Sequence, residues 1–203
     1  MPVNGTAAGT AAGTEPVAIV GMDVILPGAG SLEDYWRNLV GGVDAITDAP
    51  PSRLEPDLYN PDEADQPDRL YCRRGGFVDE FAYFDPVSYG IMPSSVPATE
   101  PEQLIALRVA AAAIEDAGGA DRLPDRDRVG VILGRLGMSS MAHMRFYLRV
   151  RLGDQMRHLL RELLPDVSED RLDLIRRKIG ESLGAHQAES VIGLMPNLTA
   201  SRI

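Results

Sequence analysis

Two short, continuous apolar runs constrain the fold of this chain more than any other feature of its sequence. Residues 17–20 (Val-Ala-Ile-Val) end at Gly21, and residues 129–133 (Val-Gly-Val-Ile-Leu) end at Gly134. Such runs are typical of strands that are buried on both faces of a sheet. Helical patterns separate and follow them, and this order predicts an α/β fold. Two central strands are too few for a finished sheet, so we expect an incomplete one.

The first two helices are marked by their ends. Ser31 is a good N-cap for a helix that Gly41 and Gly42 would stop. Thr99 and Glu102 have the spacing of a capping box at the start of the second helix. That helix should end at residues 118–119, which are both glycine.

A helical hairpin is predicted from about residue 138 to residue 184. Pro165 ends its first helix and Ser168 caps the second. Apolar residues recur at helical spacing along both helices. On the first they are Met141, Met144, Leu148, Leu152, Met156, Leu159 and Leu163, and on the second Leu172, Ile175, Ile179 and Leu183.

The first helix of the hairpin is basic, with five arginines against Asp154 and Glu162 between residues 145 and 162. One interpretation is that it docks an acidic partner. We favour the other, in which it is a solvated face that pairs with an acidic segment of this chain. That segment, residues 44–69, holds eight acidic residues and two arginines and is rich in proline. It is predicted to be an irregular surface excursion.

After this excursion, Phe81, Tyr83 and Phe84 are expected to re-enter the core. At the other end of the chain, residues 1–15 are rich in Gly, Ala and Thr and are typical of a flexible leader rather than a signal peptide. Residues 16–203 then form one domain, with the hairpin inserted in it.

The charge and composition of the chain exclude some functions. The net charge is −10 and the sequence pI is about 4.7, which is the wrong sign for a general nucleic-acid-binding protein. No run of 18 apolar residues is present, so no transmembrane helix is predicted. A single cysteine excludes an intramolecular disulfide and favours the reducing cytoplasm.

Two short motifs have both a functional and a structural interpretation. Residues 28–30 (Gly-Ala-Gly) precede a helix, but Glu33 stands where a dinucleotide-binding fingerprint requires its third glycine. A turn that leads into the helix is the better interpretation. Cys72 lies beside Arg73 and Arg74, which favour the thiolate. We nevertheless favour a structural cysteine over a nucleophile, because no histidine is near it in sequence.

The three histidines, His143, His158 and His186, show none of the spacings of metal ligands, so no metal site is predicted. His158 is expected at the edge of a solvated face. His186 follows the hairpin, where its positive charge suits a helix C-terminus.

Several segments resemble, in the same order, the N-terminal part of a β-ketoacyl synthase of the polyketide and fatty-acid type. They are residues 15–22, 26–28, 32–36, 42–46, 74–79, 84–91, 115–118 and 129–134. Residues 100–103 (Glu-Pro-Glu-Gln) depart from the Asp-Pro-Gln-Gln run of modular synthases. This departure and the long hairpin resemble the iterative synthases of polyenes, enediynes or polyunsaturated acids.

The resemblance implies part of the first half of a thiolase-like fold, in a homodimer. It implies decarboxylative Claisen condensation of acyl and malonyl thioesters, through a cysteine and two histidines. The family binds no cofactor directly, and phosphopantetheine is carried by its partner, the acyl carrier protein. No catalytic residue of the family maps onto this chain. The cysteine is expected shortly beyond Ile203, so the chain alone is expected to be inactive without the remaining part of the ketosynthase.

The segment before that cysteine borders the dimer interface and the acyl pocket in the family. Leu194, Met195, Pro196 and Asn197 are therefore the predicted substrate-binding residues. Two alternatives remain open from the residues themselves. In the first alternative, the chain is a non-catalytic interaction or dimerisation module. In the second, it is a small enzyme that uses Cys72.

Overall fold

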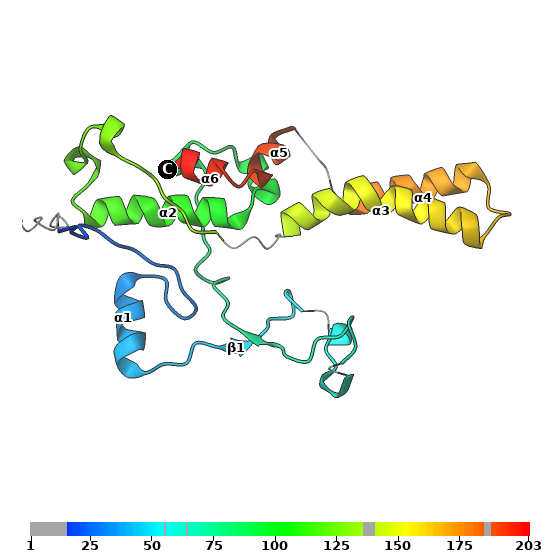
Figure 1. Ribbon diagram of the computed structural model, residues 1–203, viewed down its shortest axis with the longest axis horizontal. Coiled ribbons are helices and arrows are strands. Elements are labelled where there is room, and N and C mark those ends of the chain that lie inside the picture. The colour runs from blue at the N-terminus through cyan, green and yellow to red at the C-terminus, as the bar shows by residue number, and fades with distance from the viewer. Residues whose placement is uncertain (1–15, 55, 64, 136–140, 185–187) are drawn as a thin grey trace, which may run out of the picture.

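The computed structural model describes residues 16–203 except residues 55, 64, 136–140 and 185–187. Its regular structure is almost entirely helical (Figure 1). The α-helices are α1 (Leu32–Gly41), α2 (Pro101–Asp116), α3 (Met141–Leu163), α4 (Glu169–Ser182), α5 (Ala188–Leu194) and α6 (Leu198–Arg202). The strands are β1 (Thr47–Asp48) and β2 (Arg74–Gly75). The short 3-10 turns are η1 (Pro56–Leu58), η2 (Pro61–Glu63), η3 (Val87–Tyr89), η4 (Pro93–Ala98), η5 (Ala120–Arg122) and η6 (Arg126–Arg128).

The first helix forms where its end signals predict it. The Ser31 hydroxyl accepts a hydrogen bond from the Asp34 N–H at 3.2 Å, and Gly42 ends the helix in the left-handed region at φ 62°. A tight turn precedes the helix, because the backbones of Leu26 and Ala29 exchange two hydrogen bonds of 2.9 Å. Gly28 occupies this turn at φ 71°, which confirms the structural interpretation of the Gly-Ala-Gly motif.

The second helix ends as predicted but begins differently. Its N-cap is Glu100, whose side chain makes no capping hydrogen bond. The predicted capping box is therefore wrong. The Thr99 hydroxyl instead donates to the Ser95 carbonyl at 2.8 Å, because η4 supplies an acceptor immediately upstream. Gly118 and Gly119, at φ 103° and 91°, follow the C-terminus as expected.

The two apolar runs do not form buried strands, which corrects that prediction. Val17 is 95% exposed and Ile132 is 96% exposed. Among the described residues the only sheet is the antiparallel pair of β1 with β2, which has Thr47 opposite Gly75 and Asp48 opposite Arg74. A central strand needs a hydrogen-bonded neighbour on each side, and no described segment supplies one for either run.

The first run nevertheless contacts the C-terminal half of α2. A Cβ atom added to Gly21 would lie 2.2 Å from the Ala113 carbonyl oxygen and 2.9 Å from the Ala117 Cβ atom. The next residue, Met22, donates its N–H to the Asp116 carboxylate at 2.9 Å. Glycine is required here because the two backbones touch.

The acidic segment is irregular, as predicted, with only β1, η1 and η2 as short elements. The basic residues that follow it hold it in place. Arg73 pairs with Asp48 at 3.0 Å, and Arg74 pairs with Asp44 at 3.7 Å. Asp44 and Asp48 therefore pair with the arginines that follow the acidic segment, and not with the basic helix as predicted.

Two of the three aromatic residues that follow are partly buried. The Phe81 ring fills the space beside Gly30, and the Phe84 ring stacks on the Tyr89 ring at 4.9 Å. The third, Tyr83, is 73% exposed, so its predicted core position is wrong. Arg108 donates to the backbone carbonyls of Phe81, at 2.6 Å, and Tyr83, at 2.7 Å, so it holds the Tyr83 backbone while the Tyr83 ring stays outside.

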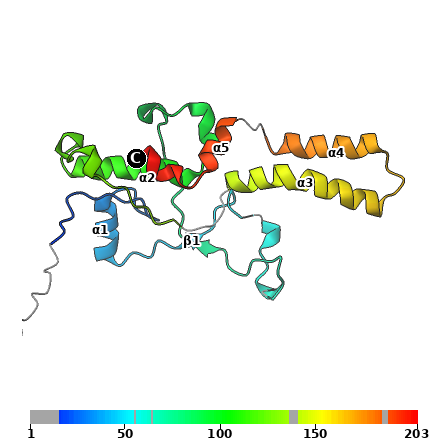
Figure 2. The ribbon, with the colours of Figure 1, turned by 45° about the horizontal axis from the view of Figure 1, so that its top comes forward.

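The hairpin formed by α3 and α4 projects away from α2 in both ribbon views (Figures 1 and 2). The two helices lie side by side and antiparallel, with Leu172 1% exposed between them. A Cβ atom on Gly153 would lie 3.1 Å from Arg176 Cγ, so the helices approach closely there.

Ion pairs inside the hairpin correct the prediction that α3 pairs with the acidic segment. Arg157 and Arg161 each contact Glu169 at 2.5 Å, and Arg176 contacts Asp154 at 3.2 Å. The carboxylates of α4 are the nearer partners because the two helices are connected by a short turn. The leader and His186 lie outside the described residues.

Candidate functional site

A groove of about 950 Å³ lies along α2. Helix α2 forms one wall, α6 forms another, and residues 24–26 and 133–135 cover the remaining sides. Most of its lining is aliphatic. These residues are Val24, Ile25, Leu26, Ile105, Ala106, Val109, Ala110, Ala113, Leu133, Ala200 and Ile203. An elongated apolar groove of this kind accommodates a hydrocarbon chain.

The groove lining also contains polar and charged residues, among them Glu102, Arg135 and Asn197. Arg135 forms ion pairs with Glu102 and, at 3.8 Å, with Glu100 Oε2. The Glu100 side chain is 1% exposed. The Arg135 charge therefore compensates a buried carboxylate, which would otherwise be costly to desolvate. This network attaches the end of the second apolar run to the start of α2.

Gln103 attaches α2 to the chain that precedes α6. It is fully buried, and its Nε2 donates to the Gly193 carbonyl at 2.8 Å and to the Met195 carbonyl at 3.0 Å. The Glu100 N–H donates to the same Gly193 carbonyl at 3.0 Å. A Cβ atom on Gly193 would lie 2.7 Å from Thr99 Cα, so the two backbones touch. Residues 193–195 are therefore held against the N-terminal end of α2.

The structure brings two of the four predicted site residues to the groove. Pro196 and Asn197 line it, directly after the turn that Gln103 holds. Leu194 is buried at 9% exposure and Met195 is 46% exposed, and neither belongs to the lining. Leu194 thus packs in the interior, while Met195 faces outward.

Sequence reasoning missed Glu102, Arg135 and the apolar face of α2 as parts of a site. The sequence pattern assigns Glu102 only to a helix cap. Arg135 carries a usable signal, because a charged residue directly after a buried-type apolar run is often functional in α/β proteins. The pairing of Arg135 with α2 depends on contacts between segments 33 residues apart, which periodicity does not reveal.

Cys72 and the two histidines of the described residues lie outside the groove lining. Cys72 is exposed, and its thiol donates to the Arg74 carbonyl at 3.8 Å. The neighbouring guanidinium groups have other partners, since Arg73 pairs with Asp48 and Arg74 donates to the Ile46 carbonyl at 3.0 Å. His143 and His158 are exposed on α3.

The described part of the chain contains no group of three or more His, Cys, Asp or Glu residues arranged to hold a metal ion. Within the same residues, none of the helices has the length and apolar character needed to cross a membrane.

Comparison with known protein families shows to which family the chain belongs. Residues 14–152 match the model of the N-terminal domain of β-ketoacyl synthases. The chain belongs to the β-ketoacyl synthase family. The predicted resemblance is confirmed, and the fold class is the α/β, thiolase-like class of this family. This ketosynthase segment contributes helices and extended runs to that fold.

Three relatives illustrate the match. Polyketide synthase PksN of Bacillus subtilis is 37% identical over 129 residues, covering 63% of this chain and 2% of the relative. The pikromycin synthase component PikAII of Streptomyces venezuelae is 45% identical over 127 residues, covering 61% and 3%. A polyunsaturated fatty acid synthase polypeptide of Thraustochytrium is 26% identical over 186 residues, covering 92% and 6%.

Solved structures of ketosynthase domains are also similar in part. The oxazolomycin ketosynthase domain OzmH KS7 of Streptomyces albus has 33% identity and a TM-score of 0.46, covering 49% of this chain and 18% of that one. The module 6 ketosynthase of the Bacillus subtilis bacillaene synthase has 39% identity and a TM-score of 0.43, covering 50% and 16%. The chain thus spans a small fraction of the length of each of these relatives.

Proposed function

We propose that this chain is the N-terminal portion of a ketosynthase that condenses acyl and malonyl thioesters in polyketide biosynthesis. The match of residues 14–152 to the family model carries this proposal. In the complete enzyme a cysteine thiolate takes the acyl group as a thioester. The malonyl thioester then loses CO₂, and the resulting carbanion attacks the acyl carbonyl and displaces the cysteine. One carbon–carbon bond forms in each cycle.

The groove along α2 supports a role for this chain in holding the acyl group. Its aliphatic lining suits a hydrocarbon chain, and Pro196 and Asn197 form part of its wall. We propose that residues 194–197 shape the acyl pocket, with Leu194 packing behind it and Met195 at its outer side. Gln103 would keep this wall in position, because it binds the carbonyls of residues 193 and 195.

We further propose that the enzyme is of the iterative type that makes polyunsaturated or related chains. The polyunsaturated fatty acid synthase matches 92% of this chain, and that match necessarily includes most of the hairpin. PksN and PikAII, although more identical, match only 63% and 61%. The predicted departures from modular synthases, in residues 100–103 and in the hairpin, agree with this proposal.

The same proposal specifies the protein partners of the chain and the cellular compartment in which it acts. The chain would act with the remaining part of the ketosynthase, in a homodimer in the cytoplasm. Its substrates would arrive on the phosphopantetheine arm of an acyl carrier protein, with no cofactor bound by the chain itself. Cys72 would not be the nucleophile, since it is exposed and outside the groove.

Condensation by the complete ketosynthase tests this function. Acyl and malonyl carrier-protein thioesters are mixed with the enzyme, and CO₂ release and β-ketoacyl products are followed by mass spectrometry. We expect Asn197→Trp, which places a large ring in the groove, to lower kcat/KM for long acyl chains at least tenfold more than for acetyl. Gln66→Trp, an exposed position in the acidic segment, is the matched control. Equal losses for long and short chains would contradict the pocket assignment, and no condensation by the unsubstituted enzyme would contradict the function.

A non-catalytic interaction module is the second candidate, and the projecting hairpin favours it (Figure 2). The intact mass of the natural protein under denaturing conditions separates the two. A species much heavier than 22.0 kDa, or a second chain of complementary size, supports the ketosynthase. A single species of 22.0 kDa supports the module.

A further inference from the structure

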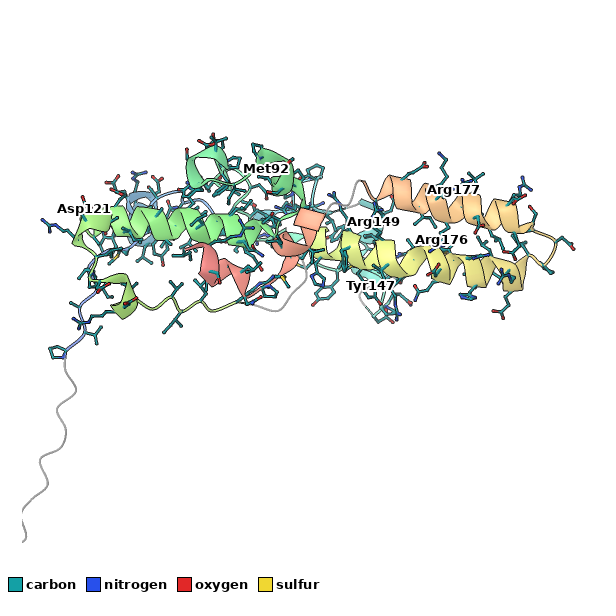
Figure 3. The ribbon with its side chains drawn as sticks, turned by 90° about the horizontal axis from the view of Figure 1, so that it is seen from above. Met92, Asp121, Tyr147, Arg149, Arg176 and Arg177 are labelled. Carbon is teal, nitrogen blue, oxygen red and sulfur yellow. The ribbon has the colours of Figure 1, made fainter. Side chains whose placement is uncertain are left out.

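One side of the hairpin formed by α3 and α4 is apolar, and no other described element packs extensively on it. Leu172 is the only large apolar residue of the described hairpin that is fully buried. The two helices pack chiefly against each other and extend beyond α2 (Figure 3). Leu159 stays 46% exposed and Leu163 64% exposed. Helices normally cover such residues with another layer, so this side of the hairpin is available to a partner.

Helix geometry separates the apolar residues of α3 from its ion pairs. Gly153 marks the side of α3 that faces α4, because a Cβ atom there would lie 3.1 Å from Arg176 Cγ. At about 100° per residue, Arg157 and Asp154 lie about 40° and 100° from Gly153 in one direction, and both form ion pairs with α4. Five apolar residues lie about 60–140° from Gly153 in the other direction. They are Leu148, Leu152, Met156, Leu159 and Leu163.

Helix α4 is divided in the same way around its buried Leu172. Glu169 and Asp173 lie about 60° and 100° from it in one direction, and Ile175 lies about 60° from it in the other. Arg157 pairs with both Glu169 and Asp173, so the paired residues of the two helices share one side of the hairpin. The apolar residues share the opposite side. We call this side, with the five residues of α3 and Ile175, the apolar face.

The charged residues follow the same division. All six acidic residues of the two helices lie about 60–180° from Gly153 or Leu172 in the direction of the ion pairs, away from the apolar face. They are Asp154, Glu162, Glu169, Asp170, Asp173 and Glu181. Basic residues, in contrast, occur on the apolar side. Arg145 on α3 and Arg171 and Lys178 on α4 lie about 80–120° from the same reference residues, in the direction of the apolar residues.

Two of these basic residues are available to a partner. Arg145 and Arg171 are exposed and form no ion pair with another described residue. Lys178 pairs with Glu181 at 2.8 Å. Arg149 lies between the two helices (Figure 3) and donates to a backbone carbonyl of α4 at 2.8 Å, so its charge is used inside the hairpin. The free charge beside the apolar face is therefore positive.

We infer that the apolar face binds an anionic lipid surface, with the hairpin lying flat on it. Leu159 and Leu163 insert among the acyl chains, while Arg145 and Arg171 reach the anionic headgroups. An apolar face with basic neighbours is typical of amphipathic helices that lie in the membrane interface. Long basic side chains keep their charge at the headgroups while their stems cover apolar surface. The cytoplasmic leaflet supplies the negative surface potential.

The width of the apolar face favours a lipid surface over a single partner helix. Both helices contribute to it, and its two free arginines lie at opposite ends. Arg171 is nearly level with Arg157, because Arg157 pairs with Asp173. Arg157 is 12 residues from Arg145, so the two free arginines are separated by roughly 20 Å along the hairpin. A planar surface contacts both at once, whereas one helix between α3 and α4 would cover mainly the central apolar residues.

The acidic remainder of the chain does not prevent this contact. Residues 141–184 carry +2, from nine basic and seven acidic residues, so the rest of the chain carries −12 of the total of −10. The hairpin projects away from that remainder (Figures 1 and 2). The ion-paired side of the hairpin stands about one helix diameter, roughly 10 Å, above the surface. Screening at physiological ionic strength acts over about 8 Å, so the nearest charges dominate.

Co-sedimentation of the 203-residue chain with lipid vesicles tests the inference. Vesicles of equal parts phosphatidylcholine and phosphatidylglycerol should bind the chain at least tenfold more tightly than vesicles of phosphatidylcholine alone. Leu159→Glu should weaken binding to the anionic vesicles at least tenfold. The matched control is Val150→Glu, which changes a 55% exposed valine on the ion-paired side of α3 and should alter binding by less than about twofold.

A second pair of variants tests the charge. Arg171→Gln should weaken binding to the anionic vesicles about fivefold. Arg177→Gln makes the same change on α4 at an exposed arginine that forms no ion pair with another described residue and lies outside the apolar face. It should alter binding by less than about twofold. Circular dichroism checks that all four variants keep the helix content of the unsubstituted chain.

Three results would overturn the inference. The first is a chain that sediments with neither kind of vesicle, or equally with both. The second is an equal loss of binding in Leu159→Glu and Val150→Glu, or in Arg171→Gln and Arg177→Gln. The third is binding of a synthetic leucine- and glutamate-rich amphipathic helix without binding of vesicles, which would indicate a protein partner instead. Vesicle binding needs no thioester substrate, so its failure would leave the proposed condensation untouched.

Discussion

At the scale of single residues, buried polar groups decide how the groove is built. Gln103 uses both N–H bonds of its amide on backbone carbonyls, and Glu100 is held beside Arg135. Neither residue stands out in sequence as part of a site, because both resemble ordinary first-turn residues of a helix. Their burial follows from the packing of residues 193–199, about 90 positions later, against the start of α2.

Replacing the buried amide tests this role. Gln103→Glu would place a carboxylate against two carbonyl oxygens in a fully buried position, so we expect a loss of about 3 kcal/mol in the free energy of unfolding. Gln155→Glu makes the same chemical change at an exposed position of α3. It should alter the free energy of unfolding by less than about 0.5 kcal/mol. Urea unfolding, followed by circular dichroism, measures both. Equal effects would show that Gln103 does not hold the turn.

At the scale of elements, end signals located the helices well. Ser31 with Gly42 bounds α1, and Gly118 with Gly119 follows α2, because capping depends on a few neighbouring residues. The hairpin helices also agree with their apolar spacing. The prediction of a helix start was wrong where a neighbouring turn offered another hydrogen-bond partner. The Thr99 hydroxyl donates to the Ser95 carbonyl in η4 instead of capping α2.

The hairpin should lose stability in acid. The hydrogen bond from Arg157, followed by that from Arg161, lowers the pKa of Glu169 below its ordinary value of 4.5. A carboxylate with a lowered pKa in the folded state stabilises the fold at all pH values above the ordinary pKa. This contribution is lost as the pH falls from 4.5 through the lowered pKa.

Helicity measured between about pH 7 and pH 2 checks this dependence. Glu169→Gln should remove part of the acid-induced decrease in the helical circular dichroism signal. Glu162→Gln is the control, since Glu162 has no ion pair with another described residue and its removal should leave the acid profile unchanged. An unaltered profile in Glu169→Gln would show that this ion pair does not contribute.

At the scale of the whole molecule, the chain exposes more surface than a compact protein of its mass. Its accessible surface is 15808 Å², against roughly 9,300 Å² for a compact 22 kDa monomer. Val17 and Ile132 are among the most exposed apolar residues. Both runs lie within residues 14–152, which match the family model, and this chain covers only 2–6% of the length of PksN, PikAII and the polyunsaturated fatty acid synthase polypeptide. We therefore expect further ketosynthase polypeptide to cover them.

Hydrogen exchange tests this expectation. Backbone amides of residues 17–21 and 129–134 should exchange quickly in this chain, because no described strand accepts their hydrogen bonds. In the complete ketosynthase the same amides should be protected at least a hundredfold. Amides of residues 106–113, inside α2, serve as the internal reference and should be slow in both. Rapid exchange of the two runs in the complete enzyme would contradict their role as central strands.

Local patterns in the sequence were enough to locate helices α1 to α4, the irregular acidic segment and the family of this protein. These features depend on capping, apolar spacing and short motifs, whose physical causes act within a few residues. The groove, the position of Arg135 between Glu100 and Glu102, and the exposure of the two apolar runs were decided only by tertiary structure. Each depends on whether a distant segment donates a hydrogen bond or covers a surface, and such pairings leave no periodic trace in the chain.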